Sequence, residues 1–388
     1  MTAAAATQNE LRPGFVELAY GEPDPRLLPV DAVWRAAART LAEGGSAAIA
    51  YGSAQGPSIL RGALAARMSA HEGVAVGADD VVVTGGNSQA LDQALTVFAE
   101  PGDSVLVESP TYNLALLTIG DHPVEVAGLP HDEGGLDVEA CAATVHALRA
   151  QGRRPCLLYT VPTYHNPTGV CLREDRRAAL VALAAAEDLI LVEDDVYREL
   201  AYDGEAPPAL WSLDPDAPVL RLGTFSKSLA PGLRVGWLTG RADLRARFAA
   251  AGMIESGGCP SQFAATVAGE LLASGEYDSH IATLRAAYRS RRDALVTALR
   301  EHAPPGCDFV VPRGGYFIWL GLPARLTSRV LVTHADRRRV SFIPGGRFST
   351  SGGDTHLRLA FSLYDEATLA EGARRLAAAI RDAQRASA

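Results

Sequence analysis

Positive charge, cysteine and long apolar runs are all scarce in this sequence of 388 residues. Lysine and arginine together number 36 against 45 aspartates and glutamates, so the net charge is −9. That balance argues against binding to nucleic acid or to anionic membranes, because both need a positive field. No uninterrupted apolar run reaches the ~20 residues that a membrane helix needs.

The few cysteines also exclude two kinds of site. They are odd in number, widely spaced and without a Cys-x-x-Cys pair: Cys141, Cys156, Cys171, Cys259 and Cys307. This pattern fits neither a disulfide framework nor a zinc site, so we expect no metal and a reducing, cytoplasmic location. Residues 1–10 lack a charged start followed by an apolar core and predict no secretory signal.

Short apolar runs alternate with amphipathic segments through the first two thirds of the chain. Amphipathic stretches at 88–98 and 173–187 predict helices between strands. This alternation indicates an α/β fold, a doubly wound sheet with helices on both faces. The predicted buried strands are 81–83, 104–107, 156–159, 189–192 and 219–222.

The last third has a different pattern. A helix is predicted at 286–301 and another at 366–384, with strands between them at 316–320, 340–343 and 357–361. We therefore expect a smaller α+β domain formed by residues 286–388 with the N-terminal segment 1–45. Residues 46–285 form the predicted large domain.

A glycine pair follows the first predicted strand and opens a helix, in the run Thr84-Gly85-Gly86-Asn87-Ser88. Glycines allow a sharp turn, and the free amides at the start of a helix favour an anion such as phosphate. An ordinary glycine turn, with Asn87 or Ser88 as the helix cap, is the plainer interpretation.

A second motif, Tyr164-His165-Asn166-Pro167-Thr168-Gly169, follows the strand predicted at 156–159. Ligands of open α/β sheets bind beyond the carboxyl ends of strands. Asn166 precedes a proline, which favours an extended backbone, and it can present its amide to a ligand. A proline-stiffened turn is the alternative, and His165 alone is interpreted as a surface or packing residue rather than a base.

Carboxylates end the strand predicted at 189–192, in the run Glu193-Asp194-Asp195-Val196-Tyr197. They could bind a divalent metal, balance a cation or cap a helix. The chain offers no clear set of further metal ligands nearby. An acid that pairs with a protonated ring nitrogen is therefore the sharper interpretation.

Lys227 follows the strand predicted at 219–222, in the run Gly223-Thr224-Phe225-Ser226-Lys227-Ser228. A lysine is normally a solvated surface charge. At a sheet edge beside small residues it can lose its water, which lowers its pKa as Schiff-base chemistry requires. Arg234, a little further along, could hold a phosphate through charged hydrogen bonds.

The last signal is an arginine inside the apolar strand Leu357-Arg358-Leu359-Ala360-Phe361. Such an arginine is costly unless it is paired. A substrate carboxylate bound by both ends of the guanidinium would satisfy Arg358, and so would a structural salt bridge.

Taken in this order, the motifs resemble those of fold type I pyridoxal-phosphate (PLP) enzymes, specifically class I/II aminotransferases. The nearest subgroup resembles the 2-aminoadipate and kynurenine aminotransferases and the aminotransferase-like half of MocR regulators. The resemblance runs from about Leu18 to Leu376. It implies a large domain built on a mostly parallel seven-stranded sheet, plus a smaller α+β domain.

The resemblance also implies a role for each catalytic residue. Lys227 would form the internal aldimine with pyridoxal 5′-phosphate and then carry the proton between Cα and C4′. Asp194 would pair with the pyridinium nitrogen, which keeps the ring protonated as an electron sink. Tyr197 and Asn166 would hydrogen-bond the 3-oxygen of the ring, and Tyr112 would stack on it.

The remaining implied contacts hold the phosphate and the substrate. Arg358 would bind the substrate α-carboxylate, and Gly21 lies in the N-terminal segment that crosses the site. Tyr51 would reach the phosphate of a neighbouring subunit, which implies a homodimer with shared active sites. The phosphate itself would be held by Asn87, Ser88, Thr224 and Arg234, supported by Ser226.

These implications favour an enzyme that moves the amino group of an L-amino acid to a 2-oxo acid. A PLP-dependent lyase, decarboxylase, cyclase or oxidase is the alternative, because the same groups serve each reaction and the outcome depends on which bond stands perpendicular to the ring. A ligand-sensing or scaffold domain is a third possibility. Retention of Lys227, Asp194 and Arg234 together argues against it, since a module that only binds needs no base beside Cα.

Overall fold

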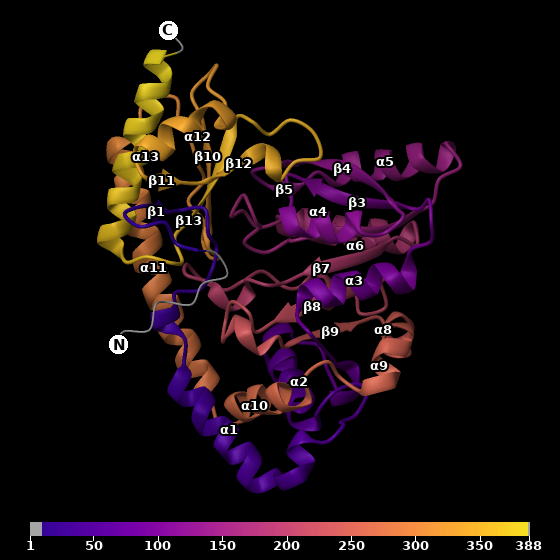
Figure 1. The fold of residues 1–388 in the computed structure, drawn as a ribbon. Coiled ribbons are helices and arrows are strands. Elements are labelled where there is room, and N and C mark those ends of the chain that lie inside the picture. Colours follow the sequence, from indigo (N-terminus) through magenta and orange to yellow (C-terminus); the bar gives the residue numbers. More distant parts are fainter. Residues whose placement is uncertain (1–9, 387–388) are drawn as a thin grey trace.

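A mostly parallel sheet forms the centre of the larger part of the molecule, with helices on both of its faces (Figure 1). The structure is a computed structural model that describes residues 10–386. The prediction about a secretory signal falls almost wholly on residues 1–9, outside the described residues. Within residues 10–386, none of the helices is both long enough and apolar enough to cross a bilayer.

The central sheet has the strand order β2-β9-β8-β7-β6-β3-β4-β5. Strands β8, β7, β6, β3 and β4 run parallel, whereas β9 lies antiparallel between β2 and β8. The predicted mostly parallel sheet of seven strands is confirmed, and a two-residue strand, β5, adds an antiparallel eighth at its edge. The strands are β2 (Val82–Thr84), β3 (Ser104–Ser109), β4 (Glu125–Asp132), β5 (Gly135–Leu136), β6 (Pro155–Thr160), β7 (Ile190–Asp194), β8 (Val219–Thr224) and β9 (Gly236–Gly240).

Both faces of this sheet are buried, which explains the continuous apolar runs in its strands. In β3, Val105 and Val107 pack into one core with α3, α4 and α8, while Leu106 between them packs into another with α5, α6 and α7. The helices are α3 (Asn87–Phe98), α4 (Asn113–Gly120), α5 (Val138–Ala150), α6 (Glu174–Ala186), α7 (Leu210–Leu213), α8 (Ala242–Ala249) and α9 (Gly252–Gly257).

Besides the two-residue β5, two strands of this sheet are not predicted by apolar runs. Strand β4 lies near the edge, is mostly exposed and contains Gly128 and Pro130, so its sequence lacks the apolar signal. Strand β9 is buried, but it is only five residues long and has a glycine at each end. Glycine is depleted in strands, so this pattern indicates a turn as readily as a strand.

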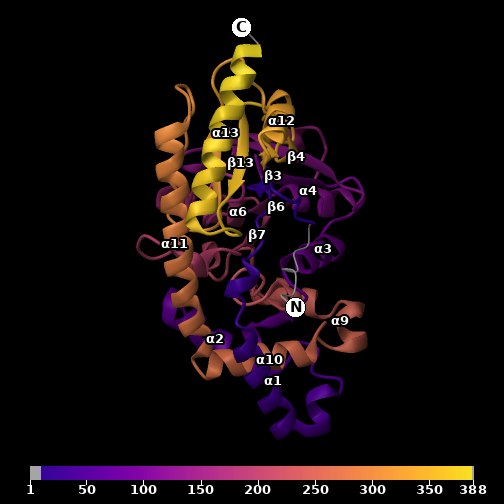
Figure 2. The same cartoon turned by 60° about the vertical axis from the view of Figure 1, so that its left-hand side comes forward.

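The smaller part of the molecule is an antiparallel sheet of order β10-β13-β12 with helices against it. Strand β1 comes from the N-terminal segment and pairs in parallel with β11 (Figure 1). Helices α11 and α13 lie side by side in Figure 2. The elements are β1 (Val16–Glu17), β10 (Phe317–Gly321), β11 (Val340–Ser341), β12 (Ile343–Pro344), β13 (His356–Ala360), α11 (Glu276–His302), α12 (Ser328–Arg337) and α13 (Glu366–Ala386).

The N-terminal segment joins the two parts. After β1 it runs past the end of the central sheet to α1 (Val30–Gly44), at the far end of the molecule beside α2 (Ser58–Glu72) and α10 (Gln262–Ala273) (Figure 1). Helix α11 begins ten residues before the predicted helix start at 286 and crosses the predicted domain boundary without a break. The division into 46–285 and 1–45 with 286–388 stays a prediction.

Candidate active site

The carboxyl ends of four neighbouring parallel strands carry the predicted site residues. In the order β8-β7-β6-β3, these strands lead to Lys227, Asp194, Asn166 and Tyr112. Because the strands are parallel, all four residues follow the same edge of the sheet, where open α/β sheets bind ligands.

Lys227 lies just beyond β8, partly buried, and its ammonium group donates a hydrogen bond to the Gly21 carbonyl at 2.9 Å. Burial and the positive charges of Arg358 and Arg234 lower its pKa to about 8, against a smaller opposing effect of Glu22. A pKa this low leaves part of the amine neutral near pH 7, which nucleophilic and basic lysines need.

Lys227 is also the only lysine in the 388 residues, and every other basic side chain of the Lys/Arg set is arginine. An arginine can replace a surface lysine as a positive charge, but its guanidinium cannot lose a proton in a protein. The one lysine of the chain thus lies where the structure lowers the pKa of an amine. The presence of a single lysine is itself a sequence signal for this site, beyond the motif around it.

Asp194 ends β7 with its carboxylate buried between two hydrogen-bond donors. Tyr159 donates its hydroxyl to Oδ2 at 2.6 Å, and the Asn87 side-chain amide donates to Oδ1. Burial raises the pKa of Asp194 to about 6, with the two hydrogen bonds opposing and Asp195 adding to the rise. The predicted phosphate ligand Asn87 therefore directs its side chain to the carboxylate.

An anion cradle lies at the N-terminus of α3. Arg234 donates to the Ser226 hydroxyl at 3.4 Å, and the hydroxyls of Ser226 and Thr224 are 2.9 Å apart. Gly86 precedes the helix with φ +97°, and a Cβ there would lie 3.1 Å from the Arg234 guanidinium. Ser88 is exposed in the first turn of the helix. Helix amides, two hydroxyls and a guanidinium together suit a phosphate group.

Arg358, in β13, is buried with its guanidinium between two aromatic rings. Its Cζ lies 4.1 Å from the centre of the Phe317 ring and 4.9 Å from that of Phe348. It donates to Asn166 Oδ1 at 2.9 Å and to the Ala19 carbonyl at 2.8 Å, while its buried Nε has no hydrogen-bond partner among the described residues. Burial lowers its pKa to about 10.

The structure brings two of the three predicted tyrosines to this edge. Tyr197 is 2% exposed and packs against Tyr316 and Phe317. Tyr112 is partly buried at the start of α4, and its pKa is raised by burial and by the nearby Asp194 carboxylate. Tyr51, by contrast, is 92% exposed, so it is not enclosed by its own chain.

Gly21 lies where the N-terminal segment passes Lys227. A Cβ on this glycine would come within 2.5 Å of the Phe317 ring, so the segment approaches β10 as closely as only glycine allows.

Sequence reasoning missed two partners of the site, the Tyr159 hydroxyl and the Ala19 carbonyl. Each contacts a site residue far away in the chain, so no local motif points to it.

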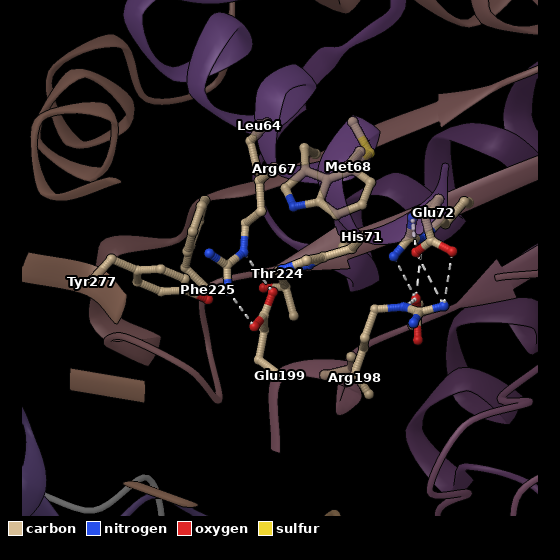
Figure 3. Close-up of a pocket in the computed structure, with 15 residues that line it drawn as sticks. Leu64, Arg67, Met68, His71, Glu72, Arg198, Glu199, Thr224, Phe225 and Tyr277 are labelled. Atoms are coloured by element: carbon tan, nitrogen blue, oxygen red, sulfur yellow. Dashed lines mark hydrogen bonds and ion pairs between the residues drawn. The ribbon is translucent and has the colours of Figure 1, made fainter. Parts of the chain in front are cut away.

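A second pocket lies between α2 and the end of β8, and Thr224 of the anion cradle also lines it (Figure 3). Glu72 Oε1 lies 3.1 Å from both Arg198 and Arg221, and Asp195 Oδ2 lies 2.7 Å and 2.8 Å from the same two guanidinium groups. These buried groups form ion pairs of opposite charge. They hold the segment that follows β7, and neither the lysine nor the β7 aspartate described above lines this pocket.

The model of the family described as "Aminotransferase class I and II" matches residues 13–376. The chain belongs to this family. It is a PLP-dependent amino acid aminotransferase, as the predicted resemblance implied. An aromatic-amino-acid aminotransferase of Thermococcus litoralis is 34% identical over 95% of this chain and 88% of its own length.

Two solved structures agree. Kynurenine aminotransferase from Pyrococcus horikoshii superposes with a TM-score of 0.89 at 35% identity, covering 95% of this chain and 91% of that one. The α-aminoadipate aminotransferase LysN from Thermus thermophilus, solved with N-(5′-phosphopyridoxyl)-L-leucine, gives a TM-score of 0.87 at 31% identity, covering 96% and 94%. The kynurenine and aminoadipate aminotransferases named in the predicted resemblance are thus both represented.

Proposed function

We propose that this aminotransferase moves the amino group of an L-amino acid to a 2-oxo acid, with Lys227 as the base that carries the proton. One observation carries this assignment of roles. The only lysine of the chain has a pKa lowered to about 8 and lies at the carboxyl edge of the sheet, beside groups suited to each part of the cofactor. Its neutral fraction has the lone pair that accepts a proton from Cα.

Pyridoxal phosphate supplies a protonated ring that accepts the electrons left on the substrate when its Cα proton departs. Asp194 keeps the proton on the ring nitrogen in this proposal. Its raised pKa of about 6 reports a buried carboxylate without a cation close by, and a positively charged ring nitrogen provides that cation. Tyr159 and Asn87 hold the carboxylate in place through both of its oxygens.

The other cofactor contacts follow from the positions described above. Tyr112 would lie against the ring face, and Asn166 and Tyr197 would donate hydrogen bonds to its 3-oxygen. The phosphate would be held by the α3 amides at Asn87 and Ser88 and by groups from the end of β8 and the loop after it: Thr224, Ser226 and Arg234. The side-chain amide of Asn87 already donates a hydrogen bond to Asp194. Asn87 would therefore offer only its backbone amide to the phosphate.

Arg358 binds the α-carboxylate of the substrate in this proposal. Its guanidinium is fixed by Asn166, the Ala19 carbonyl and two aromatic rings, and its buried Nε still lacks an acceptor. A carboxylate supplies that acceptor and matches the planar fork. Gly21 covers the lysine from the N-terminal segment, which excludes water from the reacting carbon.

We further propose a homodimer with shared sites. A row of large apolar side chains is exposed on α1 and the turn after it, including Trp34 at 69% and Ile49 at 70% exposure, and it leads to Tyr51 at 92%. An exposed apolar row of this kind marks a protein interface. A second copy of the chain would cover it and carry Tyr51 toward the phosphate of the other subunit.

Because all five cysteines are free, we place the dimer in a reducing compartment, the cytoplasm.

The sole lysine permits a direct test. Borohydride makes a linkage between an amine and the cofactor aldehyde permanent, so mass spectrometry of the reduced wild-type holoenzyme should find one modified side chain, Lys227. Lys227→Ala should show no adduct and lose turnover by about 10³-fold or more, while its circular dichroism stays unchanged. Lys227→Arg is the matched control, since it keeps the charge without a removable proton.

Two results would contradict the assignment. The first is normal turnover in Lys227→Ala, and the second is restored turnover in Lys227→Arg, which would mean that the site needs a positive charge and no base.

The amino donor is then identified by incubating the holoenzyme with a panel of amino acids and 2-oxo acids. Release of carbon dioxide, ammonia or thiol in place of an oxo acid would argue against transamination.

A further inference from the structure

Glu108 and His165 form a buried pair behind the active site. Each side chain is 1% exposed, and Glu108 Oε2 lies 3.2 Å from His165 Nε2. The same carboxylate oxygen accepts a hydrogen bond from the backbone amide of Val161 at 2.9 Å. Glu108 belongs to β3 and His165 to the loop after β6, so the pair ties together two neighbouring strand ends.

The other ring nitrogen of His165 indicates its tautomer. Nδ1 accepts a hydrogen bond from the Thr168 backbone amide at 3.4 Å and lies 2.8 Å from the Thr168 hydroxyl. With Nδ1 as an acceptor, the ring proton is on Nε2, the nitrogen that lies 3.2 Å from Glu108 and has no closer polar partner among the described residues. The loop is closed further by two backbone bonds, from the amide of His165 to the Val170 carbonyl and from the amide of Gly169 to the His165 carbonyl.

A third side chain, His131, stacks on His165 with ring centres 4.5 Å apart and an angle of 29° between the rings. Glu108, His131 and His165 offer three possible metal ligand atoms within 4.8 Å of one another. Stacked imidazoles, however, direct their in-plane lone pairs side by side and not toward one point, and His165 Nε2 carries a proton. The arrangement therefore fits a carboxylate–imidazole pair better than a metal centre.

The charge of Glu108 is maintained in this pair. Burial by itself raises the pKa of its carboxyl, but His165 and the Val161 amide outweigh burial and hold the pKa below its usual range. A buried carboxylate of this kind is costly unless its partners stay in place. The pair thus resists any displacement of the loop that carries His165.

We propose that Glu108 and His165 act as positioning residues, forming a clamp that holds the neighbouring Asn166 in the active site. Asn166 follows His165 directly, and its Oδ1 accepts the 2.9 Å hydrogen bond from Arg358. The inference rests on the proposed function, in which Asn166 also donates to the 3-oxygen of the cofactor. Loss of the clamp therefore weakens two contacts at once, one to the cofactor and one to the substrate-binding arginine.

The test measures the holoenzyme in ways that do not depend on turnover. For each variant, the cofactor dissociation constant is measured by titrating the apoprotein with pyridoxal phosphate, and the pH midpoint of the visible cofactor band is measured by absorbance. A donor to the 3-oxygen favours its charged form, so its loss raises the midpoint. For His165→Ala we expect a rise of about one pH unit and about tenfold weaker binding, the size of one hydrogen bond to a charged group.

Matched variants separate the clamp from general packing. His165→Gln retains an N–H donor and should recover at least half of both effects. His131→Phe keeps the stacked ring and should leave both values at the wild-type level. If His165→Ala does not fold, Glu108→Gln replaces it. Its expected shift is about half a pH unit, because a neutral amide attracts the imidazole N–H less strongly than a carboxylate does.

Three outcomes would overturn the clamp. The first is a wild-type dissociation constant and pH midpoint in a folded His165→Ala or in Glu108→Gln, and the second is an equal change of both quantities in His131→Phe. The third is a stoichiometric metal in elemental analysis of the purified holoenzyme. A failure of the proposed function gives a different result. In that case the wild-type protein itself binds no pyridoxal phosphate and has no visible band.

Discussion

Asp194→Asn should stabilise the cofactor-free protein while disabling the enzyme. The carboxyl has a pKa of about 6 in the folded chain against an ordinary 3.8, a difference of about two units. At 1.36 kcal/mol per unit, ionisation of Asp194 therefore costs the folded apoprotein about 3 kcal/mol at neutral pH. Asparagine has the same shape, can accept from Asn87 and donate toward Tyr159, and carries no charge.

The sign of the pH dependence follows from the direction of the shift. Because the folded-state pKa is higher than the unfolded one, the folded state holds this proton more tightly between about pH 4 and pH 6. The contribution of protonated Asp194 is fully present below about pH 4 and is lost as the pH rises to about 6. The variant should therefore match the wild type at pH 4 and exceed it by about 3 kcal/mol at pH 7.5.

The assay is urea unfolding of the two apoproteins at both pH values, with Asp216→Asn as the control because Asp216 is an exposed carboxyl. The control should leave the free energy of unfolding unchanged at both pH values. In the holoenzyme, Asp194→Asn should lower kcat by about 100-fold or more, since the partner of the ring nitrogen is neutral. A variant apoprotein no more stable than the wild type at pH 7.5, or a difference that does not change with pH, would refute the reasoning.

Two further substitutions test the substrate and cofactor contacts. Arg358→Lys should raise the KM for the amino acid about 10- to 100-fold, because a point charge replaces a planar fork; an unchanged KM in steady-state kinetics would exclude Arg358 as the carboxylate ligand. Tyr51→Phe should weaken cofactor binding about tenfold. Mixing Tyr51→Phe with Lys227→Ala protomers should restore one site of wild-type affinity per hybrid dimer, and no restoration would show that the sites are not shared.

The sequence predicted the sheet well where its strands are buried on both faces. Strands β3, β6, β7 and β8 are continuous apolar runs, and each is followed directly by the motif that it positions. Strand β4 was not predicted because a mostly exposed strand near the edge of the sheet needs no apolar run. The start of α11 was missed by ten residues, since the helix continues beyond the stretch whose pattern predicts it.

Residue type and order in the chain determined the chemistry available here: one lysine, an acid at the end of a strand, an Asn-Pro-Thr-Gly loop and an arginine in an apolar strand. Tertiary structure alone decided the partners. The Asn87 amide reaches Asp194 across 107 positions, Lys227 reaches the Gly21 carbonyl across 206, and Arg358 reaches Asn166 across 192. Burial and charge at such distant contacts set the pKa values of the lysine and the aspartate, and a linear pattern contains no information about which distant groups will surround a side chain.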